Sequence, residues 1–385
     1  MRKLFSKMDI PLLILTIFFI VVGLVMIYSA SSVSSVVRYG YAPYHFFVRQ
    51  AIFVGVSLIF GITLIIKLPT RTYQFLAWPA LIAIILALAF LFINGKMTNN
   101  AVSWYDLGFF SLQPSEFAKS VLIVFSAIYY NKLHYRKVKN IYAYLVPLAF
   151  GAIVAGLVAM QPDLGSAAII AGIVFLTFIS VPMVQNNMIR VIKVLAVGLV
   201  IAVIVVLYSG TDLLNSMQMD RLTFQNPCSR YTETTGYQVC NGFIAINNGG
   251  LFGVGLGNST QKYLYLPESH TDFIFPIIVE ELGLLFGIFL ILCYVFMLFR
   301  ILKIAKESEN LRCSVLAYGT FWFLTLHILI NLLGILALIP LTGVPLPLLS
   351  YGGSFTVNVI VMLFIVQRVN IENKINKTKR EIKAL

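Results

Sequence analysis

The chain has 385 residues, of which 59% are apolar and only 11% are charged, and this balance excludes a water-soluble globular protein. About a quarter of the residues of a soluble domain are charged, so the surplus apolar surface must face lipid. The formal net charge of +13 would suggest nucleic acid as a partner of a soluble protein, but basic residues of membrane proteins gather in cytoplasmic loops.

About 20 apolar residues cross the hydrocarbon core as a helix, and the apolar runs of this chain predict about ten such helices. In chain order they cover residues 10–30, 50–67, 73–94, 116–131, 141–160, 164–182, 189–209, 273–299, 314–338 and 352–368. The first run is too long for the core of a cleaved signal peptide, so we expect it to be retained. The sequence therefore predicts an all-α, polytopic membrane protein with a single membrane domain over residues 1–385.

The basic residues are distributed unevenly between the two sides of the predicted helices. Most of the 28 Lys and Arg fall in segments on the side of the two termini. The positive-inside rule then places both termini in the cytoplasm and the chain in the plasma membrane. The basic segment 369–385 is expected to be a solvated cytoplasmic tail. This orientation explains the net charge without any nucleic-acid partner.

One connection is far longer than the others, the extracytoplasmic segment 210–272 between the seventh and eighth predicted helices. Loops of this length are usually functional or disordered, and its apolar residues favour an ordered one. Cys228 and Cys240 both lie in it, and two cysteines in an oxidising compartment predict a disulfide. The spacing of these cysteines lacks the histidine partners or CxxC pairs of a zinc site.

The densest polar cluster, Pro267–Phe275, precedes the eighth predicted helix. Ser269 and Asp272 are spaced as in a capping box, so one interpretation is that they only cap this helix. The other is catalytic, because a carboxylate at a membrane edge beside His270 is partly desolvated and suits a general base. Both roles can coexist, and we keep both.

A second cluster contains Trp104 and, at the start of the fourth predicted helix, Glu116 and Lys119. The two charged residues are three apart on a helix, so an internal ion pair is one interpretation. A lysine inside a membrane helix is costly unless it faces protein or water, which makes Lys119 a site candidate that could hold a phosphate.

Two further segments carry candidate residues. Asp163 lies in a short turn, where it either caps the sixth predicted helix or lines a site. Ser350 follows a stiff Pro-containing loop and precedes Gly352 and Gly353, and non-helical backbone at membrane depth is tolerated only where it lines a cavity or is buried in protein. His134 and His327 show no partners in the sequence and are interpreted as structural.

These residues resemble the SEDS family, the shape, elongation, division and sporulation proteins, and the resemblance covers essentially the whole chain. The motifs that carry it are Tyr28–Ser31, Arg49–Gln50, Gln113–Glu116 with Lys119, Gln161–Gly165, Gly236–Gln238, Leu266–Glu268 with His270–Phe275, Glu280–Gly283, and Ser350–Ser354. The stretch 226–268 is more similar to the division members than to the elongation members, and the paired cysteines look like those of Gram-positive division members. One departure is Ser103, because the family more often has a basic residue just before Trp104.

The resemblance implies a peptidoglycan glycosyltransferase that polymerises lipid II at the outer membrane face during cell division. It implies a class B penicillin-binding protein and other divisome proteins as partners, and no organic cofactor. Asp272 matches the aspartate on which family activity depends and would be the general base of an inverting displacement. The substrate-binding candidates are Arg49, Trp104, Glu116, Lys119, Asp163, Arg221, His270 and Ser350. Arg49, Lys119, Arg221 or a divalent cation, Mg²⁺ or Mn²⁺, would stabilise the leaving diphosphate.

Two rival functions are compatible with a polytopic chain. A lipid II flippase would use intramembrane charges for alternating access, but the polar clusters gather at one face and several predicted helices carry almost no charge. A scaffold that only recruits a synthase would leave Asp272 and Lys119 without a purpose. The sequence therefore favours the polymerase and keeps the flippase as its alternative.

Overall fold

The computed structural model describes residues 2–94, 96–98, 101–106, 108, 111–138, 140–182, 193, 224–232 and 234–384. The seventh predicted helix, 189–209, lies outside the described residues, as does Arg221. Within them, seven helical segments are long and apolar enough to cross a membrane. The prediction of an all-α polytopic membrane protein is confirmed at this level.

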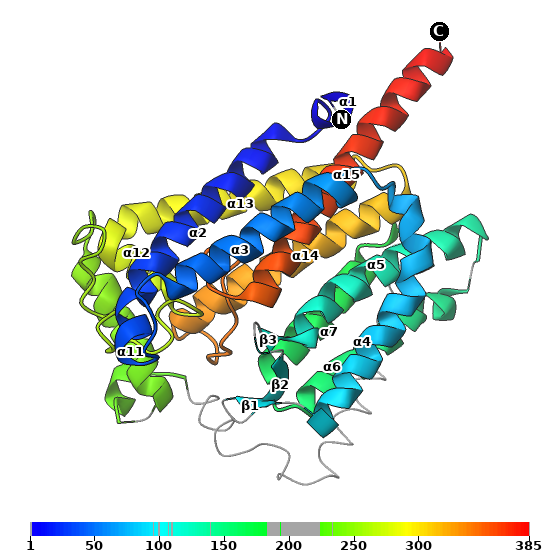
Figure 1. The fold of residues 1–385 in the computed structure, drawn as a ribbon. Helices are drawn as coiled ribbons and strands as arrows, with labels where there is room; N and C mark the ends of the chain where they lie inside the picture. The colour runs from blue at the N-terminus through cyan, green and yellow to red at the C-terminus, as the bar shows by residue number, and fades with distance from the viewer. Residues whose placement is uncertain are drawn as a thin grey trace.

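The long helices lie side by side, and both chain ends are at the same end of the bundle (Figure 1). The seven membrane-crossing segments contain α2 (Ile10–Val37), α3 (His45–Phe60) with its π-helical extension Gly61–Ile65, α4 (Gln74–Asn94), α6 (Val146–Ala159), α13 (Leu284–Lys306), α14 (Leu311–Ile335) and α15 (Gly353–Ala384). Two more helices run through the bundle, α5 (Pro114–Tyr135), which carries internal charges, and the shorter apolar α7 (Leu164–Ile179).

The opposite end of the bundle, called the far end below, carries a small sheet and two further helices. Three short antiparallel strands, β1 (Lys96–Thr98), β2 (Ala101–Asp106) and β3 (Ser111–Leu112), form a small sheet in that order. The helices α11 (Thr234–Gly249) and α12 (Ile274–Leu282) also lie at this end of the bundle. The sheet was not expected from hydropathy, because its strands are too short to give a periodic signal.

Helix α15 is the most enclosed membrane segment, with 89% of its apolar window buried inside the protein. Close approach of its neighbours depends on glycine. A Cβ at Gly61 would lie 2.3 Å from the Phe364 ring of α15, and one at Gly353 would lie 2.7 Å from Phe53 of α3. No side chain fits either position without displacing a ring. α3 and α15 therefore pack tightly, and this contact positions the loop that precedes α15.

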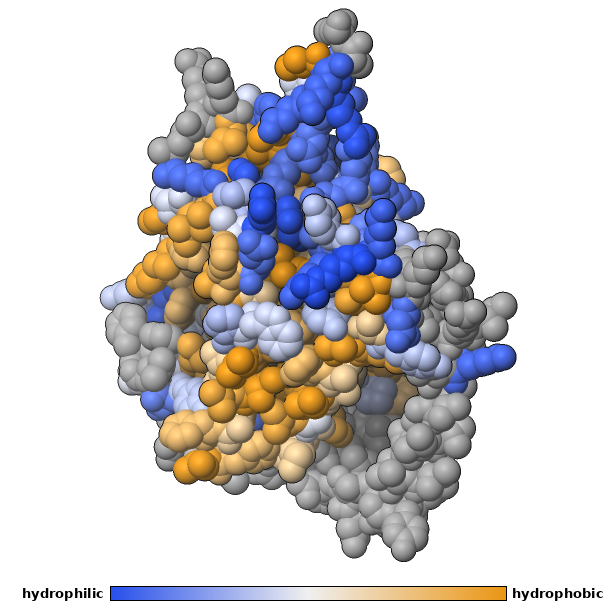
Figure 2. Space-filling view, turned by 90° about the vertical axis from the view of Figure 1, so that its right-hand side faces the viewer, coloured by the Kyte–Doolittle hydropathy of each residue, from blue (hydrophilic) through white to orange (hydrophobic). Residues whose placement is uncertain are grey.

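The outward faces of several helices are apolar. Exposed large side chains line α2 and α13, among them Ile14, Val21, Ile288 and Leu292. Figure 2 shows hydrophobic side chains over the middle and lower part of the molecule and hydrophilic ones gathered at the end where α15 terminates. Contiguous apolar surface of this kind needs lipid or another membrane helix to cover it.

Two predicted elements differ from the structure. The eighth predicted helix, 273–299, is interrupted at Gly283 and forms two helices, α12 and α13. Gly283 has a φ of 89°, a positive value that glycine adopts more readily than other residues. The predicted tail 369–385 is not a separate loose segment, because α15 continues to Ala384. Its first residues are buried, as Val369 and Ile371 are 0% exposed, and only the later turns project into solvent. The apolar residues Val369 and Ile371 therefore continue the packed face of α15 beyond residue 368, where the predicted helix ended.

Candidate active site

The segment Glu268–Phe273 lies at the far end and is held by backbone hydrogen bonds from distant elements. Asn331 of α14 donates through Nδ2 to the carbonyl oxygen of Asp272 at 2.8 Å and to that of Val344 at 2.7 Å. The backbone N–H of Tyr351 donates to the carbonyl oxygen of His270 at 2.9 Å. One buried amide thus ties the segment to the loop 340–352 and fixes both against the bundle.

The Asp272 side chain is 8% exposed. Its Oδ1 accepts a hydrogen bond from the Thr271 hydroxyl at 3.2 Å. Its Oδ2 lies against Gly343, where a Cβ would be only 3.6 Å away and where φ is 69°. Asp272 does not cap a helix, so the capping interpretation is wrong. α12 begins after Phe273, and no side chain caps its N-terminus.

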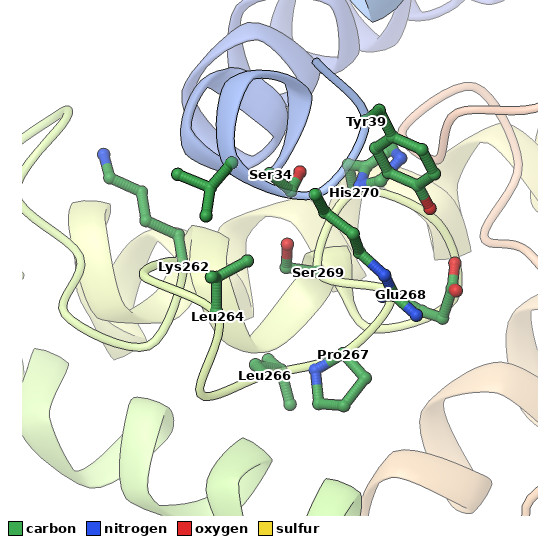
Figure 3. A pocket seen from close by; sticks show the side chains of 11 residues that line it. Ser34, Tyr39, Lys262, Leu264, Leu266, Pro267, Glu268, Ser269 and His270 are labelled. Carbon is green, nitrogen blue, oxygen red and sulfur yellow. The ribbon is translucent and has the colours of Figure 1, made fainter. Parts of the chain in front are cut away.

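A cavity of about 460 Å³ borders this segment at Glu268, Ser269 and His270. Figure 3 shows the residues that line it, which come from the end of α2, the following residues, and the segment 262–270. Its polar lining includes Arg38, Tyr39, Glu268 and His270. Asp272 is not among the residues that line this cavity, whereas Glu268 and His270 of the same segment are. The cavity volume is in the range of small-molecule sites.

His270 is 5% exposed and forms part of the cavity wall. Its ring packs against Phe46, with centroids 4.6 Å apart, and against Tyr351 at 5.7 Å. Its Nδ1 has no hydrogen-bond partner among the described residues. Burial lowers the pKa of His270 to about 4, the Glu268 carboxylate acts against this shift, and the Arg38 guanidinium adds to it. The imidazole is therefore neutral at pH 7.

The buried, neutral His270 predicts a loss of stability in acid. Between about pH 4 and 6.5 the unfolded chain binds a proton at this side chain and the folded chain does not, so the free energy of unfolding falls as the pH falls through this window. We expect His270→Asn to melt at a temperature that changes less between pH 7 and pH 4.5 than that of the wild type. Thermal unfolding in detergent measures this, and equal pH dependence of both proteins would contradict it.

Ser350 and its neighbours lock the loop that precedes α15. The Ser350 hydroxyl accepts from the backbone N–H of Leu346 at 2.8 Å and is fully buried. Gln50 of α3 donates to Thr356 at 2.7 Å and accepts from the N–H of Gly352 at 3.2 Å. Ser350 is thus part of the loop's own scaffold, and its predicted contact with substrate remains a prediction.

Arg49 is adjacent to this loop through Tyr351. Burial raises the pKa of the Tyr351 phenol, and a hydrogen bond and the positive charge of Arg49 act in the opposite direction. Because Tyr351 also packs on the His270 ring, Arg49 stands on the same side of the loop as the candidate site. Of the cations predicted to meet a diphosphate, Arg49 is the one that the structure brings close to His270 by this contact.

Asp163 caps α7, since its Oδ1 accepts from the N–H of Ser166 at 3.0 Å, as one of its two interpretations predicts. Its Oδ2 also accepts from Gln113 at 3.3 Å. A Cβ at Gly165 would lie 2.9 Å from the carbonyl oxygen of Thr342. This turn therefore packs directly on the residue before Gly343, and it belongs to the same end as Asp272.

Glu116 and Lys119 lie deeper, inside the bundle. Lys119 is 1% exposed, and its Nζ contacts Glu116 Oε1 at 2.8 Å and His327 Nε2 at 3.2 Å. The predicted ion pair is present, and His327, interpreted from the sequence as structural, has Lys119 as a partner that the sequence did not show. His327 is 208 residues away in sequence, so no local pattern could reveal the contact. The network joins α5 to α14 below the candidate site.

Other predicted residues stand apart from this centre. Trp104 lies in β2, opposite Lys96 of β1, and is half-buried. Cys228 and Cys240 form a disulfide that ties the short helical turn Pro227–Arg230 to α11. The bridge restrains the part of the segment 210–272 that precedes the cavity.

A second buried ion pair secures the rest of that segment, and the sequence did not indicate it. Lys262 Nζ contacts Glu281 Oε1 at 3.1 Å, and the hydroxyl of Ser29 from α2 donates to the same carboxylate at 2.6 Å. Glu280 accepts from the backbone N–H groups of Thr260 and Gln261 at 3.2 and 3.3 Å. The two adjacent carboxylates of α12 therefore hold the chain that leads into the cavity wall.

The fold and this arrangement of polar residues define a class of membrane protein. The chain belongs to the FtsW, RodA and SpoVE family, described as cell cycle proteins, whose match covers residues 10–375. It is 34% identical over 390 residues to the probable peptidoglycan glycosyltransferase FtsW of Bacillus subtilis, with 100% of this chain and 96% of that protein covered. It is 33% identical over 358 residues to the stage V sporulation protein E of the same species, with 90% and 92% covered.

Solved structures agree with this assignment. The crystal structure of the rod shape determining protein RodA of Thermus thermophilus is similar with a TM-score of 0.66 and 25% identity, covering 94% of this chain and 96% of that one. A chain from a study of the structural coordination of polymerization and crosslinking by a peptidoglycan synthase complex has a TM-score of 0.73 at 24% identity, covering 95% and 98%. The second likeness supports the fold.

Proposed function

We propose that the chain polymerises lipid II into glycan strands of the septal wall, with Asp272 as the general base. The protein is a peptidoglycan glycosyltransferase, as the curated FtsW relatives from several species are named. The observation that carries the assignment of the base is the position of Asp272. Its carboxylate is 8% exposed and held at the far end of the bundle without capping a helix.

The glycosyl transfer requires one general base and stabilisation of the leaving diphosphate. The 4-hydroxyl of the acceptor GlcNAc attacks the anomeric carbon of the donor, and the bond from that carbon to the undecaprenyl diphosphate breaks with its electron pair. Asp272 takes the hydroxyl proton as the new glycosidic bond forms, in an inverting displacement. Partial burial favours this task, because a desolvated carboxylate holds a proton more readily than one in water.

The leaving diphosphate gathers negative charge and needs cations at the same end. Arg38 lines the cavity and Arg49 contacts Tyr351, so these two arginines are the cations that we assign to it. Lys119 is enclosed by Glu116 and His327 and is therefore assigned first to the packing of α5 against α14. A fixed guanidinium suits phosphate oxygens because it donates in a planar fork.

A divalent cation would have to arrive with the substrate. The described residues contain no group of three or more His, Cys, Asp or Glu side chains that could hold a metal. Mg²⁺ is commonly bound by one or two carboxylates together with substrate phosphates, so a cation that arrives with the diphosphate needs few ligands from the protein. We propose that Mg²⁺ or Mn²⁺ accompanies the diphosphate as part of the substrate complex.

The orientation and partners follow from charge and from the relatives. The far end is assigned to the extracytoplasmic side, because the basic residues gather at the end of the termini. One structural relative comes from a synthase complex that combines polymerization and crosslinking, which supports a class B penicillin-binding protein as partner. The resemblance to division members extends this to the divisome.

The test is polymerisation of lipid II by the purified chain in detergent, with its partner transpeptidase and with Mg²⁺ or Mn²⁺ added. We expect a ladder of glycan strands on a gel. A second arm places the protein in vesicles and follows the movement of lipid II between the leaflets. Translocation without polymer under every partner and cation condition would overturn the proposal and favour the flippase.

A further inference from the structure

Glu268 is held in an unusual backbone conformation beside the proposed base. Its φ is 54°, in the left-handed region that residues other than glycine seldom adopt. Such a conformation costs of order 1–3 kcal/mol, and it persists where the surroundings impose it, often at functional sites. Here its carbonyl oxygen accepts from the N–H groups of Thr271 at 3.1 Å and Phe273 at 3.3 Å. The turn thereby returns Asp272 toward Glu268.

The Thr271 hydroxyl lies between the two carboxylates. Its Oγ1 is 2.9 Å from Glu268 Oε2 and 3.2 Å from Asp272 Oδ1, and 3.0 Å from the carbonyl oxygen of Glu268. A hydroxyl has one proton to donate and two lone pairs to accept with. Once Asp272 is protonated, the Thr271 hydroxyl can therefore accept that proton from Asp272 while it donates its own proton to Glu268.

The two carboxylates differ in access to water. Asp272 is buried, whereas Glu268 is half-buried and lines the cavity of about 460 Å³. Figure 3 shows the Glu268 carboxylate at the edge of the cavity beside the Tyr39 hydroxyl. A proton on Glu268 is thus closer to solvent than a proton on Asp272.

We propose that Glu268 and Thr271 form the proton exit of the active site, an inference that rests on the proposed function. The proton of the attacking sugar hydroxyl passes to Asp272 as the glycosidic bond forms and the diphosphate leaves. It then moves to Thr271 Oγ1 while the hydroxyl's own proton moves to Glu268 Oε2, and Glu268 releases it to water in the cavity. Asp272 is returned to its ionised form for the next turnover.

The charges around the relay come from several elements. Arg38 and Tyr39 follow α2 and line the cavity with Glu268, and His270 lies on the same turn. Arg49 contacts Tyr351, whose backbone N–H donates to the carbonyl oxygen of His270. His270 is neutral near pH 7. Lys262 also lines the cavity but is paired with Glu281, so Arg38 and Arg49 are the cations that we assign to oppose the two carboxylates.

The experiment measures polymerisation between pH 5 and 9 for Glu268→Gln, Thr271→Val and Thr271→Ser. We expect Glu268→Gln to lower the rate about tenfold, less than full loss of a base, and to move the acid limb of the profile to lower pH. Thr271→Val keeps the side-chain shape and the Glu268 charge, so it should lower the rate and leave the acid limb in place. Thr271→Ser keeps the hydroxyl and should restore the wild-type rate.

Two results would overturn the relay. They are a wild-type rate for Thr271→Val, or a wild-type rate and profile for Glu268→Gln. Gel filtration and an intact Cys228–Cys240 disulfide in a mass map show that each variant is folded. An active wild type with an inactive Asp272→Asn means that only the relay has failed, whereas the absence of polymer from the wild type overturns the proposed function and the relay together.

Discussion

Asp272→Asn is expected to lower the rate of lipid II polymerisation by about 10²–10⁴-fold, the usual contribution of a general base. Asparagine has nearly the same shape and accepts the hydrogen bond that the Thr271 hydroxyl donates to Asp272 Oδ1 at 3.2 Å. The hydrogen bond from the Asn331 side-chain amide to the carbonyl oxygen of residue 272 is also retained. The substitution therefore removes the base and leaves the surroundings in place, and glycan length on a gel measures the loss.

Glu307→Gln provides the matched control for this variant. Glu307 is an exposed carboxylate after α13, at the end of the chain termini, and its ion pair with Lys303 at 3.8 Å is on the surface. Surface pairs of this kind contribute little, so the control should polymerise at the wild-type rate. A folded Asp272→Asn protein that polymerises at the rate of this control would remove Asp272 as the base.

Lys119→Met is expected to destabilise the protein by about 3–5 kcal/mol, the usual cost of leaving one member of a buried ion pair without its partner. Lys119 and Glu116 are both almost fully enclosed, with side chains 1% and 5% exposed. Without the ammonium group, the buried Glu116 carboxylate loses its ion-pair partner. Denaturant unfolding in detergent micelles measures the effect.

The double variant Glu116→Gln with Lys119→Met separates packing from substrate binding. It removes both charges and should recover most of the lost stability, because neutral replacement of a buried pair is often tolerated. A double variant as unstable as the single one would contradict the ion-pair explanation. A stable but inactive double variant would show that Lys119 also serves the reaction, whereas a stable and active one would confine Lys119 to the packing of α5 against α14.

The sequence predicted most of the membrane helices because the requirement of the bilayer is local. Each crossing needs a run of apolar residues, and such runs are visible without any knowledge of neighbours. Interruptions are harder to predict. Gly283 divides a continuous apolar stretch into α12 and α13 through its φ of 89°, which composition does not reveal. The continuation of α15 beyond the membrane segment was missed because its polar residues resemble a solvated tail.

The candidate site was only partly visible in the sequence. Asp272 and His270 lie in one motif and were both selected, but the same motif also fitted a capping box. The structure does not form that box, because α12 starts after Phe273, and the catalytic role stays a prediction. Thr271 and Glu268 gained their roles only when the turn brought the hydroxyl within 3.2 Å of both carboxylates. Asn331, which fixes the carbonyl oxygen of Asp272, is 59 residues away.

By itself, the sequence determined that the chain is a helical membrane protein whose basic residues favour one orientation. It also determined that the motifs of the chain are those of one family. These properties depend on composition and on short patterns, which the solvent and common ancestry impose directly on the chain. Only the tertiary structure decided which charges meet. Lys119 contacts His327, which is 208 residues away in the sequence. Lys262 contacts Glu281 of α12. Such pairs form because the packing of the helices, and not the spacing along the chain, brings buried polar groups together.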